Sequence, residues 1–423
     1  MIRILLTTTL LLVASVAVSA DARAVGRASA DKDRAAAAQL VYGLTSNPRY
    51  AYRSRKPDDA LSSQVFDAYL DALGRASFSA GDLQGFEKYR QALDEAVMRG
   101  KLDPIYEIAA ASVRPSGTPL DRDQVLEAFL NAYVETIDPK QAYYSPFVGQ
   151  RLNPGSRPPV RAVTTKSVLE TDGKRVGVIA LGKFDAARPA SGEVARMLLE
   201  LSHAGVNGVL LDLRGNGGGS LREVIALEGL FLGRVPMMQI RESNGRISLE
   251  GSDTDQAWAG PLAVLVDRAT TSGAEMLVAA LQDHGRALVI GEATDGTGTL
   301  QNPVDMDLGY VGATPRYGRV NLTIAEVFRL DGSPLDSVGV IPDIALENGL
   351  PAPRKRDARP ASEPIRAARD FKPPVNRVDT AALKTRLKSS ASVTGTDVVL
   401  DQAASLLIQT VVGELDWSPA IGR

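Results

Sequence analysis

Asp212 opens the first of three loops whose residue types and spacing suit chemistry. It begins the run Asp-Leu-Arg-Gly-Asn-Gly-Gly-Gly, which ends at Gly219. The main-chain N–H groups of such a glycine turn can point at an anion. A dinucleotide-binding fingerprint would need glycine at position 220, where Ser220 stands, so we do not expect that ligand. The run is therefore predicted to be either an anion cradle or a tight turn without a ligand.

Ser272 is the candidate nucleophile of the second loop, Thr-Thr-Ser-Gly-Ala-Glu over residues 270–275. A serine followed three residues later by Glu275 has the spacing of a capping box, in which a hydroxyl and a carboxylate satisfy main-chain N–H groups at a helix start. Alternatively, the hydroxyl lies at a strand-to-helix turn beside the positive end of a helix and attacks an electrophile. Spacing alone leaves both interpretations open and favours the cap.

The third loop, residues 291–298, reads Gly-Glu-Ala-Thr-Asp-Gly-Thr-Gly. Its outline is that of a phosphate-binding loop, but Thr297 occupies the place of the required lysine and Gly298 that of the Ser/Thr. Nucleotide binding is therefore not expected.

Composition excludes further classes of site. The chain has no cysteine and 2 histidines, which excludes disulfides, a thiol nucleophile and thiolate or histidine-rich metal sites, so no metal or other cofactor is expected. The 48 basic and 50 acidic residues give a net charge of −2, and nucleic acid is not an expected partner.

Between residues 176 and 291, short apolar runs alternate with segments of helical period, which predicts a mostly parallel α/β core with flanking helices. Sites in such sheets form at the carboxyl ends of the strands, where all three loops would lie. Residues 320–328 and 338–346 are strand-like and are expected to extend the sheet. The other strands are predicted over 177–181, 209–213, 262–266 and 287–290, and the helices over 194–201, 222–231 and 274–281.

Residues 1–20 are predicted to be a signal peptide, because Arg3 precedes an apolar run from Ile4 to Val18 and small residues follow. Cleavage between Ala20 and Ala24 would leave a soluble chain that is exported to the periplasm or secreted. The remaining segments are predicted as a helical N-terminal region (21–146), a linker (147–162), the α/β core (163–350), a proline-rich linker (351–377) and a C-terminal helical segment (378–423).

The chain resembles the tail-specific protease (C-terminal processing peptidase) family, serine endopeptidases that cleave polypeptides near their C-termini. The resemblance implies that Ser272 is the nucleophile and that the amides of Gly218 and Gly273 form the oxyanion hole. Glu275, Gln301 and Asp283 match supporting positions. The similarity runs in order through residues 137–139, 144–146, 212–219, 264–268, 275, 282–283, 285–287, 291–292, 298–301 and 339–344.

Two departures from the family pattern stand out. The family's general base is a lysine 25 residues after the serine, and Thr297 holds that position here. A threonine hydroxyl is a poor proton acceptor near neutral pH, and loss of a positioned base costs on the order of 10²–10⁴ in rate. Family members also carry a PDZ domain after the Tyr-x-Ser-Pro segment, but only 29 residues separate Pro146 from Val176, too few for that fold.

Lys183 is the candidate substitute base, because it follows a predicted strand and emerges at the same sheet edge as Ser272. Asp295 shares this edge, but an ordinary carboxylate has a pKa near 4 and is a weak base. His284 lies about 18 Å from Ser272 along a continuous helix, and His203 belongs to the opposite edge. Asp283 is expected to support its helix or to pair with Arg286.

The sequence therefore predicts an exported protein of the tail-specific protease type that acts on or binds unfolded or C-terminal polypeptide segments, with hydrolysis weakened or lost. One alternative is an active serine endopeptidase that uses Lys183 as its base. Another is a non-catalytic pseudoprotease that regulates an unidentified partner protein.

Overall fold

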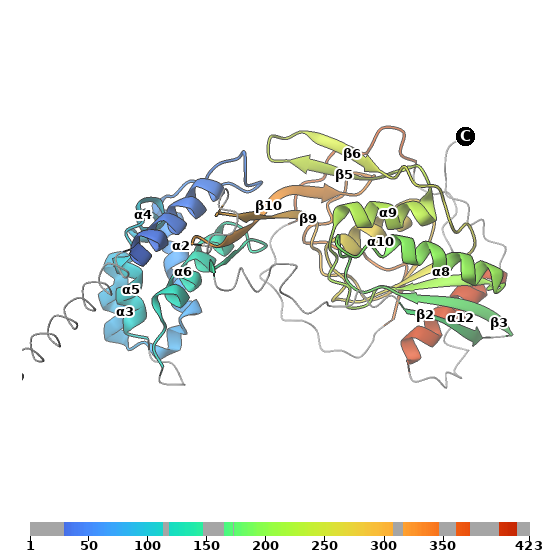
Figure 1. Cartoon of the computed structure of the whole chain (residues 1–423), viewed down its shortest axis with the longest axis horizontal. Coiled ribbons are helices and arrows are strands. Elements are labelled where there is room, and N and C mark those ends of the chain that lie inside the picture. Colours follow the sequence, from blue (N-terminus) through green and yellow to red (C-terminus); the bar gives the residue numbers. More distant parts are fainter. Residues whose placement is uncertain are drawn as a thin grey trace, which may run out of the picture. The chain divides into compact units, whose positions relative to one another are not determined.

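Figure 1 shows the computed structural model of the chain, which describes residues 29–112, 118–146, 165–171, 173–307, 316–346, 361–372 and 397–412. Two compact units are present, one formed by residues 1–157 and 301–324 and the other by residues 158–300 and 325–423. The predicted signal peptide, the linker over 147–162, residues 351–360 and 373–396, and the last residues from 413 lie outside the described residues.

The first unit is mainly helical, as predicted. Its helices begin at good capping residues: Asp58 accepts a hydrogen bond from the main-chain N–H of Leu61, and Asp121 forms a capping box with Gln124. Tyr69 and Phe129 meet edge to face in the core. The elements are a helix over residues 29–45, α2 (Asp59–Ala72), η1 (Arg75–Ser77), α3 (Ala80–Phe86), η2 (Glu87–Tyr89), α4 (Leu93–Arg99), α5 (Asp103–Ala110), α6 (Arg122–Ile137) and β1 (Ala142–Tyr144).

The second unit contains a six-stranded sheet in the order β11-β8-β7-β4-β3-β2. All neighbouring strands are parallel except β2, which pairs antiparallel with β3. The strands are β2 (Thr165–Thr171), β3 (Lys174–Ala180), β4 (Gly208–Asp212), β7 (Leu262–Val266), β8 (Leu288–Gly291) and β11 (Ile344–Ala345).

Helices cover both faces of this sheet (Figure 1), which explains why its central strands are apolar throughout. Val209 and Leu211 of β4 pack into the cluster with α8 (Ser191–His203), α9 (Leu221–Leu232) and α10 (Gly273–Asp283). Leu210 points to the other face and packs into the cluster with α12 (Val398–Val412). The expected α/β core with an N-terminal helical region and a C-terminal helix is confirmed.

The sequence did not predict a second sheet. In the second unit, β5 (Pro236–Glu242) pairs antiparallel with β6 (Ile247–Gly251) and with Ala325–Phe328 of β10 (Arg319–Phe328). In the first unit, β1 pairs with the beginning of β10. Strand β9 (Thr299–Asp305) also pairs with β10.

The expectation that residues 320–328 extend the core sheet is therefore wrong, because β10 pairs in this second sheet. Of the predicted strand over 338–346, only Ile344–Ala345 is extended, as the edge strand β11. Ser337 and Gly339 have positive φ angles of 65° and 71°, and Pro342 lacks an N–H, so this segment cannot run as a strand. Residues 301–324, predicted within the α/β core, group with the helical unit.

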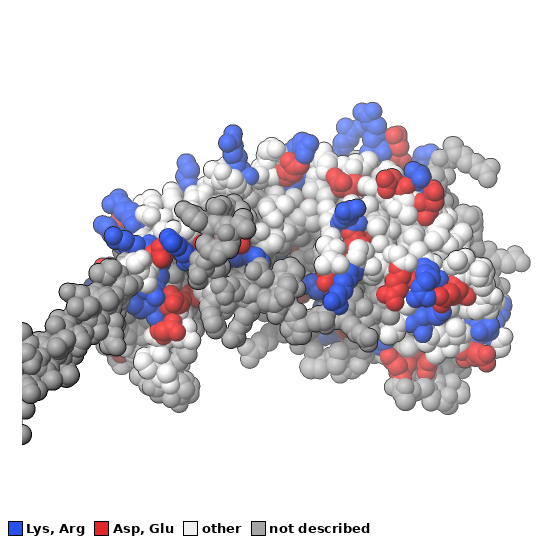
Figure 2. Space-filling model, in the orientation of Figure 1, with Lys and Arg blue, Asp and Glu red and all other residues white. Residues whose placement is uncertain are grey.

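No helix of the described residues is both long enough and apolar enough to cross a bilayer. On the face that Figure 2 shows, acidic and basic side chains are interspersed. Surface ion pairs such as those of Glu200 with Lys166 and Arg196 join side chains of opposite charge.

Leu407 of α12 is fully buried and lies over Gly208, at the start of β4. We expect Leu407→Ala to lower the free energy of unfolding by about 2–5 kcal/mol, because it leaves a cavity between helix and sheet. Urea unfolding followed by circular dichroism measures this loss. Leu199→Ala is the matched control, since Leu199 is 58% exposed and should change stability by less than about 0.5 kcal/mol. Equal effects of the two variants would contradict the packing of α12.

Glu228 of α9 is fully buried, and neither carboxyl oxygen has a hydrogen-bond partner among the described residues. Burial raises its pKa well above the ordinary value of 4.5. The folded state therefore keeps a proton that the unfolded chain releases near pH 4.5, and stability falls as the pH rises from there towards the folded pKa, by ~1.4 kcal/mol per pH unit.

Because glutamine imitates the protonated carboxyl, we expect Glu228→Gln to remove this loss. Its melting temperature relative to wild type should be higher at pH 8 than at pH 5. Glu193→Gln, at an exposed position of α8, should show no such difference. If the melting temperature of Glu228→Gln changed with pH as that of the wild type does, Glu228 would not be the group that causes the loss of stability.

Candidate active site

The three sequence-predicted loops lie at the carboxyl ends of neighbouring strands β4, β7 and β8. The first two are joined by hydrogen bonds: the main-chain N–H of Thr271 donates to the carbonyl of Asn216 at 3.0 Å. The second and third are joined by the main-chain N–H of Asp295, which donates to the carbonyl of Thr270 at 3.1 Å. The predicted convergence of the loops at one sheet edge is therefore observed.

Ser272 occupies a strained turn between β7 and α10. Its φ and ψ angles are 56° and −124°, a region that non-glycine residues rarely adopt and that costs of order 1–3 kcal/mol. A serine on a sharp strand-to-helix turn presents its hydroxyl at the top of the sheet, as in the nucleophile elbow of α/β-hydrolases. The strained backbone of Ser272 supports the nucleophile interpretation, which the sequence spacing alone did not favour.

Gly218 lies directly against this turn. A Cβ atom at Gly218 would come within 2.5 Å of the Gly273 nitrogen and 2.9 Å of the Ser272 Cβ, and its φ is +73°, so only glycine fits here. The Gly273 N–H begins α10 and has no main-chain acceptor among the described residues. The Gly218 N–H donates to the side-chain oxygen of Asn216 at 2.8 Å, so its predicted oxyanion role requires exchange of this bond.

Glu275 connects the nucleophile loop to the third loop. Its Oε2 atom accepts hydrogen bonds from two main-chain N–H groups, that of Ser272 at 2.8 Å and that of Thr297 at 2.7 Å. Its Oε1 atom accepts from the Thr294 hydroxyl at 2.5 Å and from the Gly296 N–H at 2.7 Å. Burial raises the pKa of Glu275, and these four donors oppose the rise by favouring the ionised form.

The capping and nucleophile interpretations of Ser272 are compatible. The main-chain N–H of Ser272 donates to the Glu275 carboxylate, and in the capping box at the start of α10 the Ser272 side chain acts only as an acceptor, so the cap does not use the hydroxyl proton. In the described part of the chain, no basic side chain hydrogen-bonds with the Ser272 hydroxyl.

Thr297, which the sequence predicts to stand in place of a lysine base, has its main-chain N–H close to that of Ser272, because both donate to Oε2 of Glu275. Its hydroxyl donates to Oδ2 of Asp295 at 2.6 Å, and the Thr271 hydroxyl donates to the same atom at 3.1 Å. A carboxylate thus stands next to Thr297, at the position where the resemblance predicts an amine in the family.

Asn216 and Asp267 organise the site, although the sequence analysis did not single them out. Asn216 is buried and its side-chain amide donates to the carbonyls of Leu181 and Gly182, which connects the loop after β3 to the glycine run. Asp267 accepts from the N–H groups of Gly215 at 3.0 Å and Thr270 at 2.9 Å. Both are polar residues within four positions of the end of an apolar strand, and this pattern in the sequence could have identified them.

Lys183, the predicted substitute base, is exposed, and its ammonium makes no hydrogen bond or ion pair within the described residues. Its neighbour Phe184 donates its N–H to the carbonyl of Gly218 at 2.9 Å, so Lys183 does emerge at the expected edge. Nothing brings its ammonium to the Ser272 hydroxyl, and its role as a base stays a prediction.

The remaining predicted residues have other partners. Asp283 pairs with Arg329 at its Oδ1 atom and not with Arg286, whose guanidinium donates to main-chain carbonyls. His284 contacts the carbonyl of Pro236 through Nε2 at 2.7 Å. Gln301 belongs to the first unit, where its amide donates to the Thr323 hydroxyl, and its supporting role stays a prediction.

We expect Glu275→Gln to lower the free energy of unfolding by about 1–3 kcal/mol, because one of the two glutamine side-chain atoms is an NH₂ that cannot accept from the N–H or hydroxyl donors on its side. Chemical denaturation measures the change. Glu193→Gln is the matched control, since Glu193 is also in the first turn of a helix but is exposed. If the two variants were equally stable, Glu275 would not hold the loops together.

Comparison with known proteins identifies two parts of the chain. Residues 175–346 match the model of the family described as peptidase family S41, and residues 47–116 match the tail specific protease N-terminal domain. The chain is 33% identical over 176 residues to the tail-specific protease of Haemophilus influenzae, a match that covers 41% of this chain and 25% of that protein.

It is also 34% identical over 179 residues to the chloroplastic carboxyl-terminal-processing peptidase 2 of Arabidopsis thaliana, covering 42% of this chain and 33% of that protein. The chain thus spans a quarter to a third of the length of these two relatives. A solved structure of a photosystem II D1 C-terminal processing protease is 29% identical, with a TM-score of 0.35 over 45% of this chain and 44% of that one.

Proposed function

Residues 175–346 match the model of peptidase family S41, and on this premise we propose that the site around Ser272 binds extended polypeptide and hydrolyses it weakly or not at all. Ser272 takes the place of the nucleophile, and Thr297 takes the place of the general base. Unfolded or C-terminal polypeptide segments are the proposed ligands, and the proposed location is the periplasm or the cell exterior.

The shared contact of Ser272 and Thr297 with one oxygen of Glu275 carries this proposal. Two main-chain N–H groups on Oε2 fix the backbones of the two loops at a short separation. The residue at position 297 therefore stands where a base for Ser272 would be needed. This contact supports the assignment of Thr297 to the position of the general base. The weak basicity of the Thr297 hydroxyl would then limit the rate of hydrolysis.

The chemistry needs a proton acceptor at the first step. As the Ser272 Oγ atom bonds to the scissile carbonyl carbon, the hydroxyl proton must leave and the carbonyl oxygen becomes an oxyanion. The Gly273 N–H, at the positive end of α10, can stabilise that oxyanion. The Thr297 hydroxyl, however, donates its own proton to Asp295 and has no basic lone pair of useful strength near neutral pH.

Asp295 makes the site unsuited to a simple restoration of the lysine. An ammonium introduced at position 297 would lie beside the Asp295 carboxylate, which raises the pKa of an amine and keeps it protonated. A lysine can act as a base only in its unprotonated form. The Asp295 carboxylate would therefore hinder catalysis even after the missing amine had been restored. Restoring hydrolysis should need both positions to change.

The test is an assay of the mature chain on an unfolded reporter polypeptide with a free C-terminus. We expect Thr297→Lys with Asp295→Asn to exceed the wild-type rate by about 10²–10⁴. Thr297→Lys alone should gain much less, and Asp295→Asn alone should gain nothing. Adding Ser272→Ala to the double variant should remove the activity.

Other outcomes separate the alternatives. Rapid cleavage by wild type that is lost in both Ser272→Ala and Lys183→Ala would contradict weakened hydrolysis and favour a relocated base. An inactive double variant that remains folded and binds no polypeptide would contradict the proposed function and favour a regulatory role through a partner protein.

A further inference from the structure

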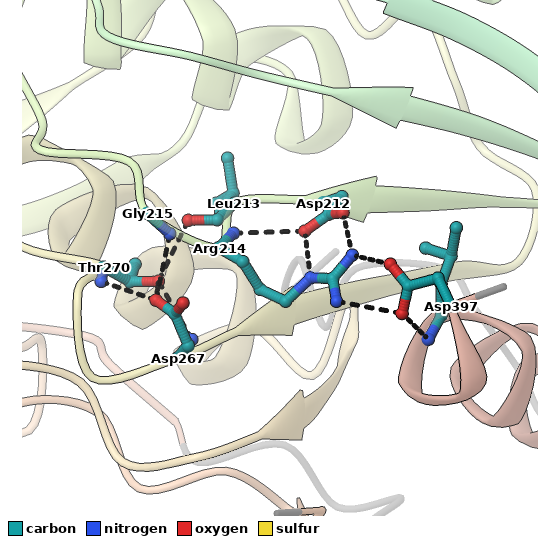
Figure 3. A network of polar contacts seen from close by, with 8 residues as sticks. Asp212, Leu213, Arg214, Gly215, Asp267, Thr270 and Asp397 are labelled. Atoms are coloured by element: carbon teal, nitrogen blue, oxygen red, sulfur yellow. Dashed lines mark hydrogen bonds and ion pairs between the residues drawn. The ribbon is translucent and has the colours of Figure 1, made fainter. Parts of the chain in front are cut away.

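Arg214 forms two paired ion contacts at the start of the glycine run (Figure 3). Its Nε and Nη2 atoms donate to Asp212 at 2.9 and 2.6 Å, and its Nη1 and Nη2 atoms donate to Asp397 at 3.1 and 2.6 Å. Bidentate contacts of this kind fix both the position and the plane of a guanidinium. Arg214 therefore joins the end of β4 to a residue 183 positions later in the chain.

Asp397 is the residue that immediately precedes α12. Its Oδ1 atom also accepts from the main-chain N–H of Leu400 at 3.1 Å, which caps the helix. The Arg214 hydrogen bond is the largest influence that lowers the pKa of Asp397, and Asp212 and Asp397 in turn raise the pKa of Arg214. The pair is thus fully charged at neutral pH.

The residue after Arg214 is part of the site's own framework. The Gly215 N–H donates to Asp267, which also accepts from Thr270, and the Thr270 hydroxyl donates to the carbonyl of Leu213 at 2.9 Å (Figure 3). Ser272 follows Thr270 by two residues. Hydrogen bonds, together with the covalent chain from Arg214 to Gly215 and from Thr270 to Ser272, therefore connect Asp397 to the nucleophile turn.

The packing of α12 shows that the ion pair between Arg214 and Asp397 is not needed to attach the helix to the sheet. Apolar side chains of α12, including Leu406, Leu407 and Ala403, are fully buried against the sheet and hold the helix without the ion pair. The Asp397 side chain is 41% exposed and that of Arg214 22% exposed, and ion pairs at such positions contribute little to global stability. Their effect is therefore expected on the local order of the loop.

We propose that Asp397 is a positioning residue for the Ser272 site: by holding Arg214, it orders the glycine run and the nucleophile turn, so that the helix after the sheet completes the site. The location of the site at Ser272 rests on the proposed function, but the coupling between Asp397 and the loops does not.

Amide hydrogen exchange of the full chain tests the coupling directly. In Asp397→Asn, we expect the amides of residues 213–219 and 269–273 to exchange about three- to tenfold faster, while β7 and the body of α12 keep their wild-type protection. Asp397→Glu retains the carboxylate and should restore part of the protection. Asp401→Asn, which removes a neighbouring charge from the first turn of the same helix, is the matched control and should leave the loops unchanged.

Two results would overturn the proposal. Unchanged exchange in residues 213–219 would show that Arg214 is held without Asp397. Faster exchange throughout α12 together with the loops would show that Asp397 acts only by attaching the helix.

A kinetic readout follows in the Thr297→Lys, Asp295→Asn background. In this double variant, Asp397→Asn should lower kcat about three- to tenfold with little change in KM. Disorder of the glycine run would weaken binding of the transition state more than binding of the substrate. An equal kcat would argue against positioning. If that background is folded but inactive and binds no polypeptide, the proposed function fails, whereas the exchange experiment still decides whether Asp397 orders the loops.

Discussion

A single buried carboxylate oxygen, Oε2 of Glu275, carries the geometry of the site. It lies between two main-chain N–H groups from different loops, while Oε1 accepts two further hydrogen bonds; a carboxylate can accept all four, whereas an amide could accept only on its one oxygen. The arrangement holds Ser272 in a backbone conformation that an isolated turn would not keep. The main-chain N–H of residue 297 bonds to the same oxygen, so the proposed nucleophile and the proposed position of its base have one common support.

The support works because the sheet beneath it is rigid. The strands β4, β7 and β8 are apolar on both faces and are covered by α8–α10 on one side and α12 on the other. Parallel strands end at one edge, and that edge therefore collects the loops that follow them. The nearly buried Asp267 then connects the loops after β4 and β7, and the buried Asn216 connects the loop after β4 to the one after β3.

Much of the core could be predicted from the sequence, because its signals are local. Strand β7 was predicted with its observed bounds, and the helices α8, α9 and α10 begin and end within a few residues of the expected positions. The positions of Ser272, Gly218 and Thr297 along one edge followed from strand order and from family resemblance.

Other features depend on tertiary contacts that no local pattern contains. The alternation in β10 is equally consistent with either sheet, and its pairing with β5 includes an ion pair between Arg241 and the buried Glu326. The hydrogen bond from the Gly218 N–H to Asn216 and the contact of Arg214 with Asp397 join residues whose relationship only the folded chain defines. The sequence placed Asp295 at the sheet edge, but it did not predict that the hydroxyls of Thr271 and Thr297 would both donate to its carboxylate.

Helix α12 has a consequence for the order in which the molecule can be built. It follows every strand of the six-stranded sheet in the sequence, and among the described residues it supplies the helical apolar side chains on one face of that sheet. During synthesis from the N-terminus, the sheet residues that pack against α12 stay uncovered until α12 has emerged. Maturation of the second unit is therefore a late event, in which the same helix that seals the interior also brings Asp397 to the arginine below the glycine turn.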